Sequence, residues 1–253
     1  MTEPALKVTA LTKRFGGLTA VNDVSLQIAK GTLHAVIGPN GAGKSTLIHL
    51  LSGDLRPTSG NIALDGRDVS SMPPDQRSRA GIGRSYQKTN IFPAFSVLEN
   101  CRLAAQSREP HAFNLFRSAS SYRPITEAAE QALIAVGLQH RIDISAGFLS
   151  HGEQRQLEIA MSLATRPRVL LLDEPLAGMG AEEAAKMVSL LHGLIKDHAI
   201  LLVEHDMDAV FALADVLTVM VNGCVLESGT PEQIRNSPEV QRAYLGHEEN
   251  EHA

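Results

Sequence analysis

The stretch LHAVIGPNGAGKST, residues 33–46, joins a mostly apolar run to a glycine-rich loop. The loop beginning at Gly38 matches the pattern G-x-x-x-x-G-K-[ST], and the apolar segment TLIHLLSG follows it. A strand before such a loop and a helix after it turn the backbone amides of the loop toward a polyanion at the positive end of the helix. The sequence therefore predicts a nucleotide phosphate site at this loop.

The polar residues of the loop have distinct expected contacts. Lys44 is expected to reach the β- and γ-phosphates, and Ser45 to offer its hydroxyl to Mg²⁺. Three glycines let the loop curl so that its amides face inward. The residues expected to bind the nucleotide are Gly38, Pro39, Asn40, Gly41, Ala42, Gly43, Lys44, Ser45 and Thr46.

A second apolar run ends in two carboxylates. In RVLLLDEP, four apolar residues precede Asp173 and Glu174. We expect Asp173 to hold Mg²⁺, directly or through water, and Glu174 to polarise the attacking water as a general base. Many buried strands end in an acidic residue, but one that follows a phosphate loop in the same chain indicates a nucleotide hydrolase.

Apolar, β-branched runs recur along the chain. Several of them lie between helix-like stretches, which predicts an α/β core with a largely parallel sheet. The runs up to about residue 68 are closely spaced, with turn residues between them. We expect these early runs to form an antiparallel layer at the edge of the core.

The composition limits the kinds of partner. The 253 residues carry a net charge of −5, whereas surfaces that bind nucleic acid are usually basic, so we expect no nucleic-acid partner. No apolar run approaches the roughly 20 residues of a spanning helix. The two cysteines, Cys101 and Cys224, lack the spacing of metal ligands. These features predict a cytosolic chain that does not cross a membrane by itself.

The segment LSHGE, residues 149–153, predicts a helix start with one unusual feature. Ser150 and Glu153 have the spacing of a capping box. Gly152 lies between them, although glycine costs roughly 1 kcal/mol at a helical position. A glycine here suggests that another group must approach the backbone closely.

The chain resembles the ATP-binding cassette (ABC) ATPases over nearly its whole length. GPNGAGKS is similar to their Walker A loop, VLLLDE to Walker B, and LSHGE to the signature segment, commonly LSGGQ. Gln87 takes the place of the family's Q-loop glutamine, which binds the metal. His205 takes the place of the switch histidine, which is catalytic. Phe15 takes the place of the aromatic residue that stacks on adenine. LAGM, residues 176–179, takes the D-loop position.

The resemblance implies a fold class and a division of the chain into a nucleotide-binding core and a helical lobe. The fold is α/β, a P-loop NTPase (RecA-like) core with an N-terminal antiparallel β layer and a helical lobe. One ABC ATPase domain is expected over residues 6–248. Residues 6–87 and 163–248 are expected to form the nucleotide-binding core, and residues from about 88 to 162 the helical lobe with the signature segment.

The resemblance also implies a shared site. In this family two ATPase domains clamp two nucleotides head to tail, and the signature helix of one covers the nucleotide on the other. Ser150 and Gly152 are then expected to contact the γ-phosphate of the ATP that the partner holds. His151 and Glu153 depart from the usual glycine and glutamine, which leaves open how tightly this half of the site binds.

Finer resemblance favours the ATPases of branched-chain amino acid importers. Its support is VEHDMDAVFALAD, EPLAGM, the polar insert near 106–124 and the ending GTPEQIRNSPEVQRAYLG. It implies ATP and Mg²⁺ as cofactors, a second ABC ATPase, two membrane permeases and, indirectly, a periplasmic binding protein as partners. It also implies a peripheral position on the cytoplasmic face of the bacterial inner membrane.

Other functions remain open from the sequence alone. Importers of urea or aromatic acids share these features. A lipopolysaccharide-export ATPase has a similar ending, but the insert argues against it. A soluble ABC ATPase, a P-loop kinase and a regulatory GTPase are further alternatives. The single phosphate loop, the signature segment and the adjacent Asp173 and Glu174 disfavour these three.

Overall fold

The computed structural model of the chain describes residues 3–86, 90–108 and 123–248, with the backbone alone for 244–248. Gln87 and most of the polar insert therefore lie outside the described residues. The strands are β1 (Leu6–Phe15), β2 (Leu18–Ile28), β3 (Leu33–Ile37), β4 (Ser59–Leu64), β5 (Arg67–Asp68), β6 (Ile82–Arg84), β7 (Val169–Asp173), β8 (Ala199–Val203), β9 (Val216–Val221) and β10 (Cys224–Gly229). The helices are α1 (Lys44–Ser52), α2 (Pro74–Ala80), α3 (Val97–Gln106), α4 (Arg123–Ala135), α5 (His151–Ala164), α6 (Ala181–Leu194), α7 (Met207–Leu213), α8 (Pro231–Arg235) and α9 (Pro238–Glu248), with short 3₁₀ turns at Gln139–Arg141 and Ala146–Phe148.

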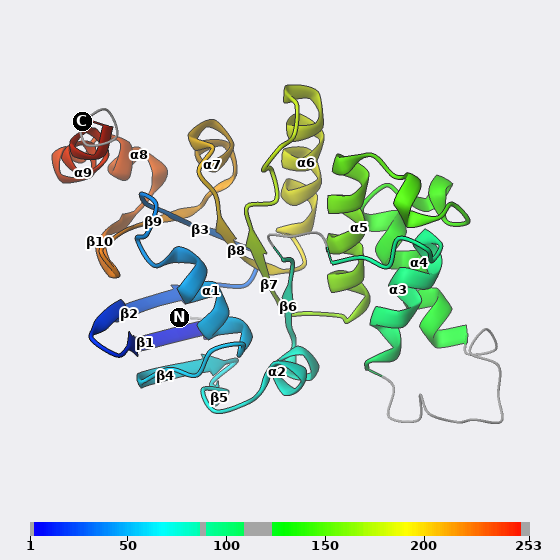
Figure 1. Ribbon diagram of the computed structural model, residues 1–253, viewed down its shortest axis with the longest axis horizontal. Helices are drawn as coiled ribbons and strands as arrows, with labels where there is room; N and C mark the ends of the chain where they lie inside the picture. The colour runs from blue at the N-terminus through cyan, green and yellow to red at the C-terminus, as the bar shows by residue number, and fades with distance from the viewer. Residues whose placement is uncertain (1–2, 87–89, 109–122, 249–253) are drawn as a thin grey trace.

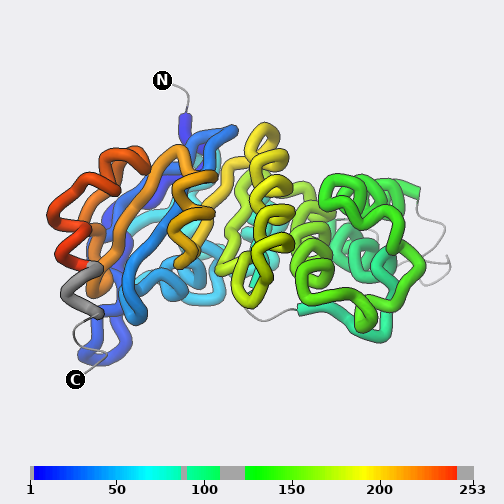
Figure 2. Tube along the Cα trace, turned by 90° about the horizontal axis from the view of Figure 1, so that it is seen from above, coloured from blue at the N-terminus to red at the C-terminus, as the bar shows by residue number. Residues whose placement is uncertain are grey.

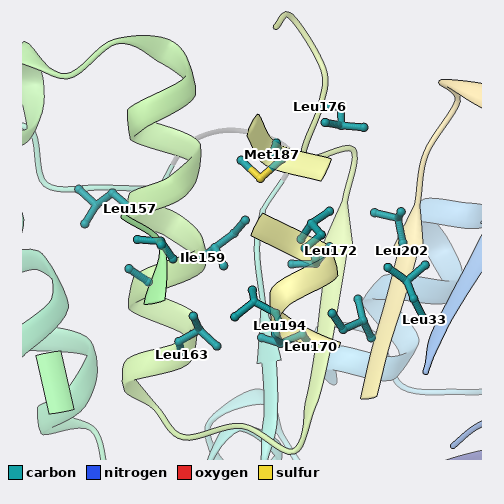
Figure 3. Close-up of a cluster of buried hydrophobic side chains, with 14 of the residues drawn as sticks. Leu33, Leu157, Ile159, Leu163, Leu170, Leu172, Leu176, Met187, Leu194 and Leu202 are labelled. Carbon is teal, nitrogen blue, oxygen red and sulfur yellow. The ribbon is translucent and has the colours of Figure 1, made fainter. Parts of the chain in front are cut away.

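A largely parallel sheet forms the centre of the molecule. Its strand order is β10-β9-β3-β8-β7-β6. Within this sheet the pairing of β10 with β9 is antiparallel, and the other described pairings are parallel. The three central strands β3, β7 and β8 are buried on both faces, so their side chains alternate between two apolar clusters. Leu170 and Leu172 point to the cluster shared with α5 and α6, shown in Figure 3, whereas Leu171 points to the opposite one.

The second sheet is the expected antiparallel layer. Its order is β2-β1-β4-β5, and β1 pairs with both β2 and β4 (Figure 1). One early run was misplaced by the sequence argument, because Leu33–Ile37 is a strand of the large sheet rather than of this layer. This strand pairs in parallel with β8 and β9, and the phosphate loop follows its carboxyl end. The α/β fold class with an N-terminal β layer is confirmed.

Helix α1 lies between the two sheets. Its buried leucines share one apolar cluster with β1, β2 and β4 and with one face of the large sheet; they are Leu47, Leu50 and Leu51. Helix α1 therefore cannot shift without opening this cluster.

The helices α3, α4 and α5 pack against one another at one end of the molecule. Figures 1 and 2 show them at the end opposite to α8 and α9. Two of these helices begin with capping boxes, Ser96 with Glu99 at α3 and Ser150 with Glu153 at α5. Across the described parts of the chain, no helix combines the length and the apolar character that a bilayer crossing requires.

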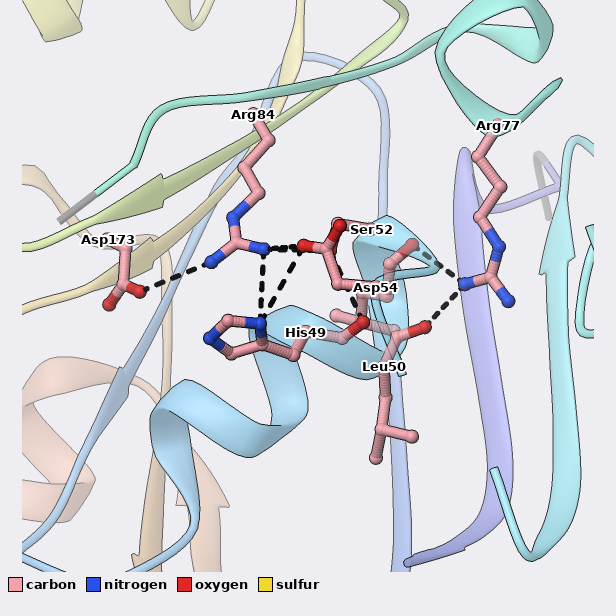
Figure 4. A network of polar contacts seen from close by, with 8 residues as sticks. His49, Leu50, Ser52, Asp54, Arg77, Arg84 and Asp173 are labelled. Atoms are coloured by element: carbon pink, nitrogen blue, oxygen red, sulfur yellow. Dashed lines mark hydrogen bonds and ion pairs between the residues drawn. The ribbon is translucent and has the colours of Figure 1, made fainter. Parts of the chain in front are cut away.

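A buried arginine anchors the far end of α1. Arg77 is 1% exposed. Its guanidinium donates to the carbonyl oxygens of Leu50 and Leu51 in the last turn of α1 (Figure 4). It also donates to the carbonyl oxygens of Ser70 and Met72. The carbonyl oxygens at the end of a helix have no partner within the helix, so this side chain satisfies groups that would otherwise be buried and unpaired.

We predict that Arg77→Met lowers the free energy of unfolding by about 3 kcal/mol, because the substitution fills the space but leaves several buried carbonyl oxygens unpaired. Chemical denaturation with urea measures the change. Arg79→Met is the matched control, since Arg79 is an exposed residue of the same helix and should shift stability by less than about 0.5 kcal/mol. Equal effects of the two substitutions would contradict the anchoring role.

Candidate nucleotide-binding and hydrolysis site

An open cleft of about 560 Å³ lies at the phosphate loop. Loop residues 40–46 line it together with Phe15 from the end of β1 and Glu174 from the end of β7. The structure thus brings together three groups of residues that are far apart in the sequence and that were predicted to contact one nucleotide.

The glycines of the loop are required by close backbone contacts. Gly38 and Gly43 have φ angles of 153° and 99°. A Cβ atom on Gly38 would lie 2.1 Å from the carbonyl oxygen of Met220, and one on Gly43 would lie 2.4 Å from that of Ala20. Side chains at either position would therefore push the loop away from the strands that support it.

Lys44 lies within the curl of the loop. Its ammonium group donates to the carbonyl oxygens of Gly38, at 2.6 Å, and Pro39, at 3.1 Å. Burial lowers the pKa of Lys44, and the nearby charges of Glu174 and Asp173 oppose that shift. The cation is thus held beside the position that the loop provides for phosphates.

Asp173 has the features expected of a carboxylate that faces a cation. It is 1% exposed, and its Oδ2 lies 3.8 Å from Nη2 of Arg84 (Figure 4). Its Oδ1 is buried and has no hydrogen-bond partner within the described residues. Burial raises the pKa of Asp173, and the guanidinium of Arg84 opposes that shift. A buried carboxylate oxygen that has no hydrogen-bond partner among the described residues fits Mg²⁺, which prefers oxygen ligands.

Glu174 is held in an uncommon backbone conformation at the end of β7. Its φ is 50°, and its amide donates to the carbonyl oxygen of Val203 at 2.9 Å. Non-glycine residues at positive φ are uncommon and tend to occur where the surrounding structure fixes them. The strand end therefore directs Glu174 into the cleft that its side chain lines.

Phe15 lines the cleft, whereas His205 does not. Phe15 is 45% exposed at the edge of the cleft, with Nζ of Lys13 5.0 Å from the centre of its ring. The side chain of His205 follows β8 and is 66% exposed. It is not among the residues that line the cleft, and its Nδ1 lies 3.6 Å from Oε2 of Glu204.

The signature residues lie at the start of α5 and away from this cleft. Ser150 caps the helix through the amide of Glu153, at 3.2 Å. Gly152 is buried, and a Cβ atom there would lie 2.9 Å from Oε1 of Glu183. The same Glu183 oxygen lies 3.5 Å from Oγ of Ser150. Within this chain, the group that approaches Gly152 closely is therefore the carboxylate of Glu183.

Sequence reasoning missed the turn between β9 and β10. Asn222 and Gly223 line the cleft, and both have positive φ. Gly223 donates to the carbonyl oxygen of Ala42 at 3.0 Å and accepts from the amide of Asn22 at 2.8 Å, which ties the phosphate loop to β2. The Asn-Gly pair between two apolar runs is a hairpin signal that predicts the turn, but not its position at the cleft.

Comparisons with known proteins agree with this geometry. The family model described as ABC transporter matches residues 21–177, and the model described as branched-chain amino acid ATP-binding cassette transporter matches residues 224–250. The high-affinity branched-chain amino acid transport ATP-binding protein BraF of Pseudomonas aeruginosa is 42% identical over 97% of this chain and 99% of its own length.

Two solved structures show the same fold. A nucleotide-free ATP-binding cassette from an ABC transporter has a TM-score of 0.85 at 30% identity, covering 95% of this chain and 98% of its own. An ATP-binding cassette of an ABC transporter in its ADP conformation has a TM-score of 0.83 at 29% identity, covering 96% and 99%.

The fold and the cleft define a nucleotide-binding P-loop protein. The family match and the extent of the similarity further show that the chain belongs to the ATP-binding proteins of ABC transporters, which are ATPases.

We predict that Lys44→Ala lowers ATP turnover by at least about 100-fold, because it removes a largely buried cation from the place where the phosphates bind. Steady-state phosphate release measures this loss. Lys30→Ala, which alters an exposed lysine in the turn between β2 and β3, should keep turnover within about twofold. Turnover in Lys44→Ala equal to that of the control would contradict the assignment of the cleft.

Proposed function

We propose that this chain is the ATP-hydrolysing subunit of an importer for branched-chain amino acids or a related small polar solute. The observation that carries the proposal is the 42% identity with a branched-chain amino acid transport ATP-binding protein over nearly the full length of both chains. The match of residues 224–250 to the branched-chain family model supports it, because that match lies outside the general ATPase motifs.

The proposal assigns roles to the residues of the cleft. Phe15 stacks on adenine, the loop residues Gly38 to Thr46 bind the phosphates, and Lys44 donates to the β- and γ-phosphates. Ser45, Gln87 and Asp173 hold Mg²⁺. When bound, the ion neutralises charge on the phosphate oxygens. The expected partition into a core, residues 6–87 and 163–248, and a lobe, residues 88–162, is part of this proposal.

Two further residues carry out the hydrolysis. Glu174 accepts a proton from the attacking water, and its place at the edge of the cleft supports this role. His205 donates a hydrogen bond to the γ-phosphate once the exposed loop that carries it approaches the nucleotide.

A second ABC ATPase, either a copy of this chain or a related one, completes the site. Ser150 and Gly152 cover the nucleotide that the partner holds, and the positive end of α5 faces its γ-phosphate. Gly152 does not line the cleft of its own chain, which supports this arrangement. Because two anions compete for the same helix end, the carboxylate of Glu183 must withdraw when the phosphate arrives.

The other partners follow from the proposed transport. They are two membrane permeases and, indirectly, a periplasmic solute-binding protein, with this chain on the cytoplasmic face of the inner membrane. The net charge of −5 supports the expectation that no nucleic acid takes part.

Uptake of radiolabelled leucine, isoleucine and valine by the host bacterium tests the proposal. Deletion of the gene should abolish the ATP-dependent uptake, and the unaltered gene should restore it. Glu174→Gln should leave uptake at the level of the deletion, because loss of the general base lowers hydrolysis by at least about 100-fold while ATP still binds.

The control is the exposed residue Glu182, whose change to Gln should restore uptake fully. Uptake of all three amino acids that is unchanged by the deletion would contradict the proposed substrate class. Restoration by Glu174→Gln would contradict the proposed mechanism.

A further inference from the structure

Glu204 is a buried carboxylate to which the hydrolysis described above gives no role. It directly follows β8 and is 1% exposed, with its side chain fully covered. Its Oε1 accepts from the amide of Leu176 at 2.8 Å, and its Oε2 accepts from the amide of His205 at 3.0 Å. Burial raises the pKa of Glu204, and these two amide hydrogen bonds oppose the shift.

These bonds join two loops that carry the proposed catalytic groups. Leu176 lies two residues after Glu174, and His205 is the residue after Glu204 itself. Strands β7 and β8 are parallel neighbours with Asp173 opposite Val203, so both loops leave the same edge of the sheet. One carboxylate therefore fixes the loop of Glu174 and the loop of His205 relative to each other.

The same carboxylate also lies beside the imidazole ring of His205. Its Oε2 is 3.6 Å from Nδ1, whereas the ring as a whole is 66% exposed. The negative charge of a carboxylate near one ring nitrogen favours the tautomer with the proton on that nitrogen. The Nε2 atom lies on the opposite side of the imidazole ring and faces away from the carboxylate of Glu204.

The backbone of the His205 loop is held from its other side as well. Asp206 caps α7, with its Oδ1 accepting from the amide of Ala209 at 3.1 Å. The loop between β8 and α7 is thus short and fixed at both ends. The exposed side chain of His205 projects from this fixed loop, with its Nδ1 near Oε2 of Glu204.

We propose that Glu204 is a positioning residue for the ATPase reaction: it holds His205 with the proton on Nδ1 and keeps Nε2 directed outward, at a fixed place relative to Glu174. The proposal rests on the function proposed above for His205 and Glu174. A glutamine cannot replace this carboxylate, because its single carbonyl oxygen accepts from one of the two amides while its NH₂ group faces the other.

Long-range ¹H–¹⁵N NMR of the full chain tests the contact directly, at a pH where the imidazole is neutral. The signals of His205 are assigned by their loss in His205→Gln. We expect the Nδ1–H tautomer to predominate in the unaltered chain, and the population to shift toward Nε2–H in Glu204→Gln. A predominant Nε2–H tautomer in the unaltered chain would overturn the proposal without the need for any variant at position 204.

Steady-state ATPase kinetics test the consequence. Glu204→Gln should lower kcat by about tenfold or more with KM for ATP within about twofold, since Glu204 is not among the residues that line the nucleotide cleft. Glu204→Asp keeps the carboxylate and should recover part of kcat. Glu182→Gln, which alters an exposed carboxylate paired with Lys186, is the control and should match the unaltered chain.

The outcomes separate this proposal from the one on which it rests. An unchanged kcat in Glu204→Gln, or equal losses in Glu204→Gln and Glu204→Asp, would overturn the positioning role. Full turnover in His205→Gln would instead overturn the role proposed for His205, while the NMR experiment would still report whether Glu204 sets the tautomer.

Discussion

The packing of α1 between the two sheets is the constraint on which the nucleotide site depends. At its start, Gly38 and Gly43 bring the phosphate loop against the carbonyl oxygens of Met220 and Ala20, with no room for a side chain. At its end, Arg77 satisfies the last carbonyl oxygens of the helix. A helix fixed at both ends keeps the loop amides and its positive end aimed at one point, which is what a preorganised phosphate site requires.

The sequence predicts the parts of the site whose residues lie next to one another along the chain. The phosphate loop and the pair Asp173 and Glu174 are continuous motifs whose strand contexts are visible in the adjacent residues. The partners of Asp173 and Gly152 are not predictable in this way, because Arg84 and Glu183 come from distant parts of the chain. The misplaced strand Leu33–Ile37 has the same cause, since strand spacing along the chain does not decide which sheet a strand joins.

The two halves of the proposed composite site are held in different ways. The phosphate loop is supported by backbone contacts from two strands, so its shape is set by the fold. At the start of α5, by contrast, the carboxylate of Glu183 lies against Ser150 and Gly152 through its side chain. A side chain moves at lower cost than a packed loop. The proposed composite site therefore combines a phosphate loop whose shape the fold sets with a helix start that requires Glu183 to move aside for the phosphate.

The central claim is that the start of α5 covers a nucleotide bound to another ATPase chain. The most direct test places a photoreactive amino acid at the exposed position 151 in the complete assembly and maps its adducts by mass spectrometry. The account predicts ATP-dependent adducts with the phosphate loop of a second ATPase, whether a copy of this chain or a related one. Adducts that are independent of ATP, or that map elsewhere, would contradict it.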